Sequence, residues 1–136
     1  MYKTYVAYHP KRKRGREPLL YEDLIALNGE GKTRSVSRMI AMMDDLRANG
    51  RESRYIKHLG EPLFELKTRT PDGGARVYFF RLNKDSFVLV RAEVKKENEA
   101  SEQLLSDVLD VIEAVQQEKD VLVPKYTPGG DDDEDD

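Results

Sequence analysis

The 136-residue sequence contains no cysteine, only two histidines and no apolar run long enough to cross a membrane. Disulfides and thiol chemistry are therefore excluded, and the lack of cysteine fits a reducing compartment. So few histidine and cysteine ligands also predict that the protein has no zinc or iron site and needs no cofactor. Because no signal-peptide pattern is present, we expect a cytoplasmic protein that does not bind membranes.

The charge is distributed unevenly along the chain. The formal net charge is −3, but six of the 26 acidic residues form the run at 131–136, and the remainder carries 23 basic against 20 acidic residues. We therefore predict one mildly basic domain at 1–123, followed by a flexible linker and acidic tail at 124–136. The tail is either a solvated end or a segment that screens a basic surface.

The most informative stretch is 63–96, where three apolar segments are separated by two tight turns. The glycines at 73–74 suit the first turn, and the pattern predicts a three-stranded antiparallel meander. If Thr70 pairs with Ala75, alternation places one phenol and three cations on the same face. These residues are Lys67, Arg69, Arg76 and Tyr78. Cations that face each other in a sheet indicate an anionic ligand.

The rest of the chain predicts an α+β fold around this meander. A strand at 2–8 would make a small four-stranded antiparallel sheet, packed against two N-terminal helices and one C-terminal helix. The helices are expected from Pro18 to 27, over 35–48 and from Asn98 or Ser101 to about 115. The apolar stripe of the last helix could close the core or bind a partner. The short apolar run at 121–123 could be an edge strand or a docking segment.

A loop at 9–16 carries five further cations, which are Lys11, Arg12, Lys13, Arg14 and Arg16. The loop could bind a phosphate backbone, or it could be a solvated surface loop. Lys57 and His58 lie in a basic connector that leads into the sheet. The Gly-Lys-Thr segment at 31–33 is not a phosphate-binding P-loop, because position 26 is Ala26 and the preceding pattern is helical.

A family resemblance rests on the motif Phe-Glu-Leu-Lys at 64–67, the segment Ala-Arg-Val-Tyr-Phe-Phe at 75–80 and the strand that ends in Val-Lys-Lys at 94–96. Their order and spacing resemble the RelE/ParE toxin superfamily, and within it the phage-derived HigB-like branch, over roughly residues 19–118. The resemblance implies a RelE-like fold and the toxin of a type II toxin–antitoxin system. Such a toxin acts as a ribosome-dependent endonuclease that cleaves mRNA without a metal, by attack of the RNA 2′-OH on the adjacent phosphate.

The resemblance also implies candidate site residues and partners. The catalytic candidates are Lys67, Arg69, Arg76, Lys95 and Lys96, with Arg76 as the phosphate clamp and the lysines as base, charge stabilisers or leaving-group contacts. RNA or ribosome contacts are expected from Lys11, Arg12, Lys13, Arg14, Arg16, Lys57, His58 and Tyr78. The expected partners are the ribosome, mRNA and a helix-turn-helix antitoxin in a hetero-oligomer. Two alternatives stay open, a ParE-like inhibitor of DNA gyrase and a non-toxic binding protein with the same fold.

Overall fold

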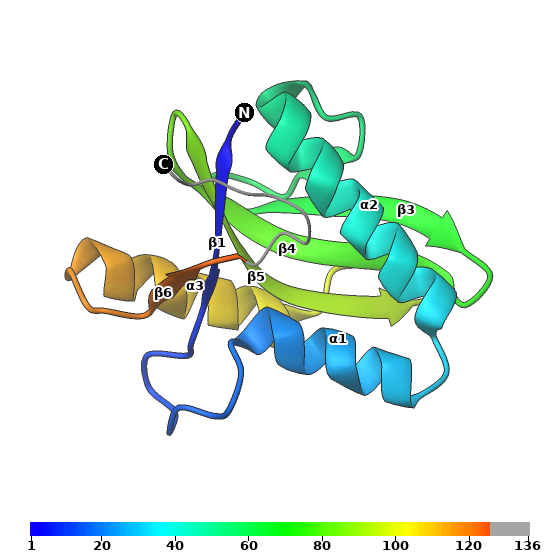
Figure 1. The fold of residues 1–136 in the computed structure, drawn as a ribbon, viewed down its shortest axis with the longest axis horizontal. Coiled ribbons are helices and arrows are strands. Elements are labelled where there is room, and N and C mark those ends of the chain that lie inside the picture. The colour runs from blue at the N-terminus through cyan, green and yellow to red at the C-terminus, as the bar shows by residue number, and fades with distance from the viewer. Residues whose placement is uncertain (126–136) are drawn as a thin grey trace.

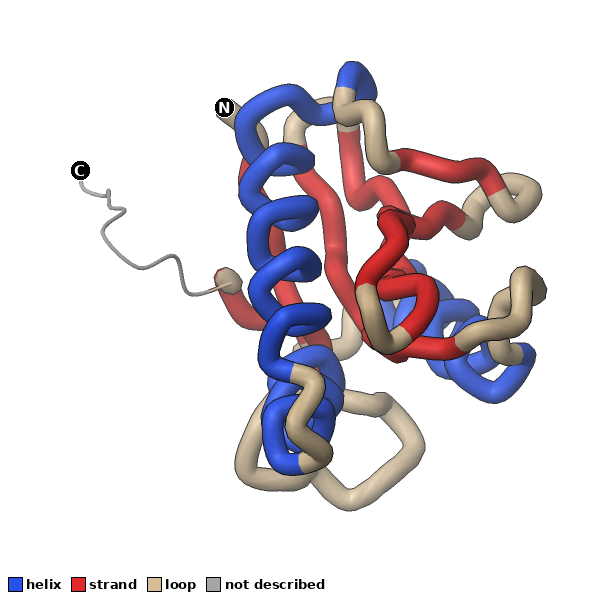
Figure 2. Tube along the Cα trace, turned by 90° about the vertical axis from the view of Figure 1, so that its right-hand side faces the viewer, coloured by secondary structure: helices blue, strands red, loops and turns tan. Residues whose placement is uncertain are grey.

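The computed structural model describes residues 1–125, which form one mixed sheet with helices on both of its faces (Figures 1 and 2). The strands are β1 (Lys3–Ala7), β2 (Ile56–His58), β3 (Phe64–Thr70), β4 (Gly73–Asn83), β5 (Ser86–Lys95) and β6 (Leu122–Pro124). The helices are α1 (Leu19–Gly29), α2 (Thr33–Asn49) and α3 (Glu102–Gln116), and a 3-10 turn (Gly50–Glu52) follows α2. Within these residues, every helix is too short or too polar to cross a bilayer.

The α+β class and the predicted helices are confirmed, but the predicted sheet is too small. Six strands follow the order β2-β3-β4-β5-β1-β6. The prediction of a purely antiparallel sheet is also wrong, because β1 runs parallel to β5. β2 and β6 have three residues each, too few for an alternating pattern to show in the sequence. The run at 121–123 does become an edge strand, because β6 pairs antiparallel with β1.

Two buried clusters hold the layers together. On one face of the sheet, α1 and α2 pack their apolar sides against alternate residues of β3, β4 and β5, and the methionines of α2 are core residues. On the other face, the stripe of α3 packs on the remaining alternate residues, including Phe80 and Val88. The predicted apolar stripe of α3 therefore closes the core through Val108, Val111 and Ala114.

The predicted register of the β3–β4 hairpin is wrong by two residues. Thr70 pairs with Gly73 instead of Ala75, which leaves a two-residue turn. Gly73 has φ of 131°, and a Cβ there would lie 2.9 Å from the Lys95 carbonyl oxygen, so the tight turn requires glycine. Because side chains change face at every residue, a shift of two leaves each of them on the predicted face.

The β3–β4 turn is fastened to the start of α2. The Ser35 hydroxyl donates to the Asp72 carboxylate at 2.7 Å and lies 2.8 Å from the Thr70 hydroxyl. Thr70 in turn donates to the Gly73 carbonyl at 2.8 Å. These bonds hold the hairpin tip at a fixed place beside α2. The predicted linker and acidic tail fall mainly on residues 126–136, which lie outside the described residues.

Candidate functional site

A hollow of about 490 Å³ opens on the α3 face of the sheet, next to the β3–β4 turn. We call it the cationic hollow. Its lining includes all five predicted catalytic residues, Lys67, Arg69, Arg76, Lys95 and Lys96, together with Lys57. β2, β3, β4 and the end of β5 each contribute at least one of these cations. The structure thus brings together residues that are up to 39 positions apart in the sequence.

Strand pairing explains why these cations converge. Lys67 lies directly opposite Arg76, and Lys95 lies opposite Gly74. Gly74 leaves open the space beside Lys67 and Arg76. A Cβ at this position would occupy that space, because it would lie 3.5 Å from the Lys67 side chain and 3.8 Å from the Arg76 Nε. α3 covers the other half of β4, where Phe80 is buried. The hollow is therefore the uncovered part of this sheet face.

Arg76 lies at the base of the cationic hollow and is fully buried. Its Nη2 donates to the Glu97 carbonyl, but its Nε and Nη1 have no acceptor among the described residues. Its Nη1 is 3.9 Å from a Glu65 carboxylate oxygen, too far for a hydrogen bond. A buried guanidinium with two nitrogens that lack acceptors is costly unless an anion accepts from them. The arrangement is therefore suited to an anionic ligand in the hollow.

Two titratable neighbours respond to this environment. Burial raises the pKa of the Glu65 carboxyl, although the Arg76 charge works in the opposite direction. Burial also lowers the pKa of Lys67, and the Arg76 and Lys57 charges lower it further. Lys67 therefore gives up its proton more readily than an ordinary lysine.

A chain of hydrogen bonds anchors Lys95 at the edge of the hollow. The Lys95 ammonium donates to the Ser101 hydroxyl at 3.2 Å, and that hydroxyl donates to the Glu93 carboxylate at 2.6 Å. The other Glu93 oxygen accepts from the Tyr78 hydroxyl. Tyr78, which the sequence predicts as an RNA contact, is fully buried, lies outside the lining of the hollow and supports this network. Burial and the bond to Glu93 raise the pKa of Tyr78 above that of an ordinary tyrosine.

Comparison with known proteins places the chain in a family. The family model described as phage derived protein Gp49-like (DUF891) matches residues 30–112, which include α2, the meander and most of α3. The chain belongs to the Gp49-like family. This family is related to the RelE/ParE-like fold and connected with toxin–antitoxin systems. A search of curated proteins found no match.

The basic loop of the Gp49-like protein lies on α3, away from the cationic hollow. Lys11 pairs with Asp110 at 3.3 Å, and Arg12 pairs with Asp107 at 2.7 Å. Arg14 lies 4.2 Å from the centre of the Tyr8 ring. Lys13 and Arg16 are exposed and form no ion pair within the described residues. Part of the charge predicted to contact RNA therefore fastens the loop to its own protein.

The centre of this attachment, Asp107, was missed by sequence reasoning. Asp107 is buried and also pairs with Arg91 of β5, which binds Asp23 of α1 through two nitrogens at 2.7 and 2.9 Å. A signal was present, because Asp107 interrupts the buried stripe of α3 one residue before Val108. Acidic residues in such a stripe are buried only with partners.

One group of side chains near this loop has the composition of a metal site. Ligand atoms of His9, Asp107 and Asp110 lie within 4.8 Å of one another. However, Asp107 already pairs with Arg12 and Arg91, and a metal cation would compete with both guanidinium groups. The His9 Nδ1 accepts from a backbone N–H, which puts the ring proton of neutral histidine on the Nε2 that faces the carboxylates. The group therefore fits internal ion pairing better than metal binding.

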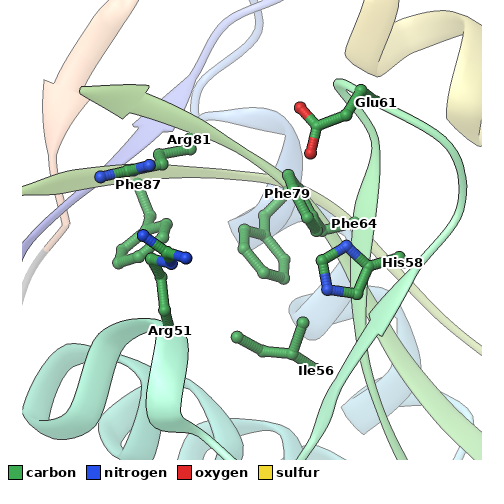
Figure 3. A pocket seen from close by; sticks show the side chains of 8 residues that line it. All are labelled: Arg51, Ile56, His58, Glu61, Phe64, Phe79, Arg81 and Phe87. Carbon is green, nitrogen blue, oxygen red and sulfur yellow. The ribbon is translucent and has the colours of Figure 1, made fainter. Parts of the chain in front are cut away.

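A second hollow of about 300 Å³ lies on the opposite face of the sheet (Figure 3). Three phenylalanines, at 64, 79 and 87, form its base, with two arginines on one side and Glu61 and His58 on the other. His58 packs edge-on against Phe64, with ring centroids 4.9 Å apart. Because adjacent strand residues face opposite ways, Lys57 lines the cationic hollow while His58 does not. Its carboxylate and small number of cations make this hollow a poorer phosphate site.

Proposed function

We propose that this Gp49-like protein is the toxin of a type II toxin–antitoxin system and cleaves mRNA on the ribosome. The observation that carries the proposal is buried Arg76, whose Nε and Nη1 lack an acceptor and which lines the cationic hollow together with five other cations. A pentacoordinate phosphate carries two negative charges, and fixed cations in a partly dry site stabilise such charge strongly. The family membership and the order of the motifs support the same assignment.

The residue types suit attack by the RNA 2′-OH. A base removes the 2′-OH proton, the 2′ oxygen forms a bond to phosphorus, and the bond from phosphorus to the 5′ oxygen breaks. The products are a 2′,3′-cyclic phosphate and a 5′-OH, with the proton returned to the leaving oxygen. Lys67, whose pKa is lowered, is the preferred base, and Arg76 holds the phosphate oxygens. Lys95 and Lys96 line the same hollow, and we assign them to donate a proton to the leaving oxygen or to stabilise its negative charge.

A second candidate function is inhibition of DNA gyrase, as in ParE-like toxins. The observation that favours it is the segment after Lys96, where Glu97 and Asn98 line the hollow and no tyrosine or histidine follows within the next turn. That segment therefore offers no tyrosine or histidine that could donate a proton to the leaving oxygen. A toxin with either activity requires a cognate antitoxin, and we expect a small helix-turn-helix protein that forms a hetero-oligomer with it in the cytoplasm.

Expression in a bacterial host separates the two activities. We expect growth arrest with an early fall in protein synthesis and shortened mRNA, while plasmid supercoiling stays normal. Loss of supercoiling with intact mRNA would favour the gyrase inhibitor instead. Normal growth together with normal translation and supercoiling would favour a binding protein without toxicity.

A further inference from the structure

A third hollow, of about 530 Å³, lies on the other side of the β3–β4 turn, against α2. Its lining is Arg34, Ser37, Arg38, Arg69, Thr70 and Pro71. Arg69 and Thr70 also line the cationic hollow, so the two depressions meet at the hairpin tip. Positive charge therefore continues from the α3 face, over the tip and onto α2. We call Arg34, Arg38 and Arg69 the arginine track.

The guanidinium groups of the arginine track are available to a ligand. All three residues are exposed, and none forms an ion pair with a carboxylate within residues 1–125. Within residues 1–125, the only side-chain hydrogen bond of the three runs from the Arg38 Nη2 to the Thr68 hydroxyl at 3.3 Å. The cations of the basic loop differ, since Lys11 and Arg12 are paired with carboxylates of α3.

The track has a defined position relative to the cationic hollow. Ser35, a buried residue of α2 next to Arg34, donates a hydrogen bond to Asp72 and lies against Thr70 at the hairpin tip. The carboxylate of Asp72, at the same hairpin tip, therefore accepts a hydrogen bond from Ser35. Because the start of α2 and the hairpin tip are fastened together, the fold fixes where the backbones of Arg34, Arg38 and Arg69 lie around this hollow.

We propose that the arginine track binds the sugar–phosphate backbone of single-stranded RNA next to the phosphate held in the cationic hollow. This inference rests on the proposed function. The track offers three guanidinium groups, which suit phosphate oxygens, and phosphate contacts carry no sequence information. A path that bends over a hairpin tip suits a flexible single strand, whereas a duplex is stiff on this length scale. The substrate is therefore an extended RNA strand several nucleotides long.

The test measures how the binding of two RNAs depends on salt concentration. One RNA has about 4 nucleotides and the other about 12, and both carry 2′-O-methyl groups that prevent cleavage. Arg34→Ala with Arg38→Ala removes two phosphate contacts from the long RNA. Each contact to a single strand contributes about 0.7 to the slope of log K against log salt, so the slope should fall by about 1.4. The loss of affinity between about 50 and 200 mM salt should then be about sevenfold smaller. The short RNA should bind both proteins with the same slope.

The matched control is Arg81→Ala with Lys84→Ala, which removes two exposed charges from the β4–β5 hairpin instead. The control should leave both slopes unchanged. An unchanged slope for the track variant, or an equal fall in the control, overturns the track while the proposed function stands if the short RNA still binds. If neither RNA binds the wild-type protein, the track is overturned, whereas the proposed function is judged separately by mRNA cleavage on translating ribosomes.

Discussion

The role of Arg76 in the cationic hollow is best tested by replacing it together with its buried neighbour Glu65. Arg76 is fully buried and Glu65 is 3% exposed, and their charged groups are 3.9 Å apart. Arg76→Gln alone leaves the Glu65 carboxyl buried without its nearest cation. We expect a loss of about 3 kcal/mol in the free energy of unfolding, at the low end for a buried pair, because no hydrogen bond joins the two groups.

The double variant Glu65→Gln with Arg76→Gln removes both charges at similar side-chain volume. Its free energy of unfolding should return to within about 1 kcal/mol of wild type, because no unpaired charge remains buried. Cleavage of mRNA should stay reduced by about 10³-fold or more, because each lost donor to the transition state costs about 10²- to 10³-fold. Glu65→Gln alone should keep its cleavage activity.

Urea denaturation and mRNA cleavage on translating ribosomes measure the two effects separately. Recovery of stability without recovery of cleavage is the expected result for the double variant. If the double variant cleaves mRNA within tenfold of wild type, Arg76 is not the phosphate clamp and the reasoning fails.

Two further predictions concern titration and the loop attachment. The lowered pKa of Lys67 means that its charge is lost as pH rises through values below the ordinary 10.5, so RNA affinity should fall over that range in wild type. The Lys67→Arg variant should keep a constant RNA affinity over the same pH range. If fluorescence anisotropy gives the same pH profile for the variant and the wild type, Lys67 is not the group that loses its charge. Asp107→Ala removes a buried carboxylate from Arg91 and should lower the free energy of unfolding by about 3 kcal/mol. Asp110→Ala, at a more exposed pair, should cost less than about 1 kcal/mol in the same denaturation assay.

The sequence predicted the elements with long periodic patterns and the face on which their side chains lie. The meander, the three helices and the common face of Lys67 and Arg76 follow from spacings of two and about four residues, which survive errors of register. The direction of β1 could not be predicted, since its pairing with β5 depends on contacts 83 positions apart, as between Lys3 and Ser86. The short strands β2 and β6 carry too few residues for any period to be measured.

The burial and the ion-pair partners of side chains were harder to predict than the face of the sheet or helix on which they lie. Arg76 is an alternating polar residue in its strand, and only the three-dimensional packing makes it buried. The basic loop has a charge pattern typical of phosphate binding, but the carboxylates that neutralise part of it lie on α3, about a hundred residues later. Local patterns therefore located the candidate site, and long-range pairing decided which cations are available to it.

The most direct test of the proposed function is the chemistry of the RNA ends that the protein makes. Purified wild-type protein is added to ribosomes translating a defined mRNA, and the fragments are mapped and their ends analysed. We expect cleavage that requires translation and leaves 2′,3′-cyclic phosphate and 5′-OH ends. Intact mRNA, or fragments with 5′-phosphate ends, would contradict attack by the 2′-OH on a phosphate held in the cationic hollow.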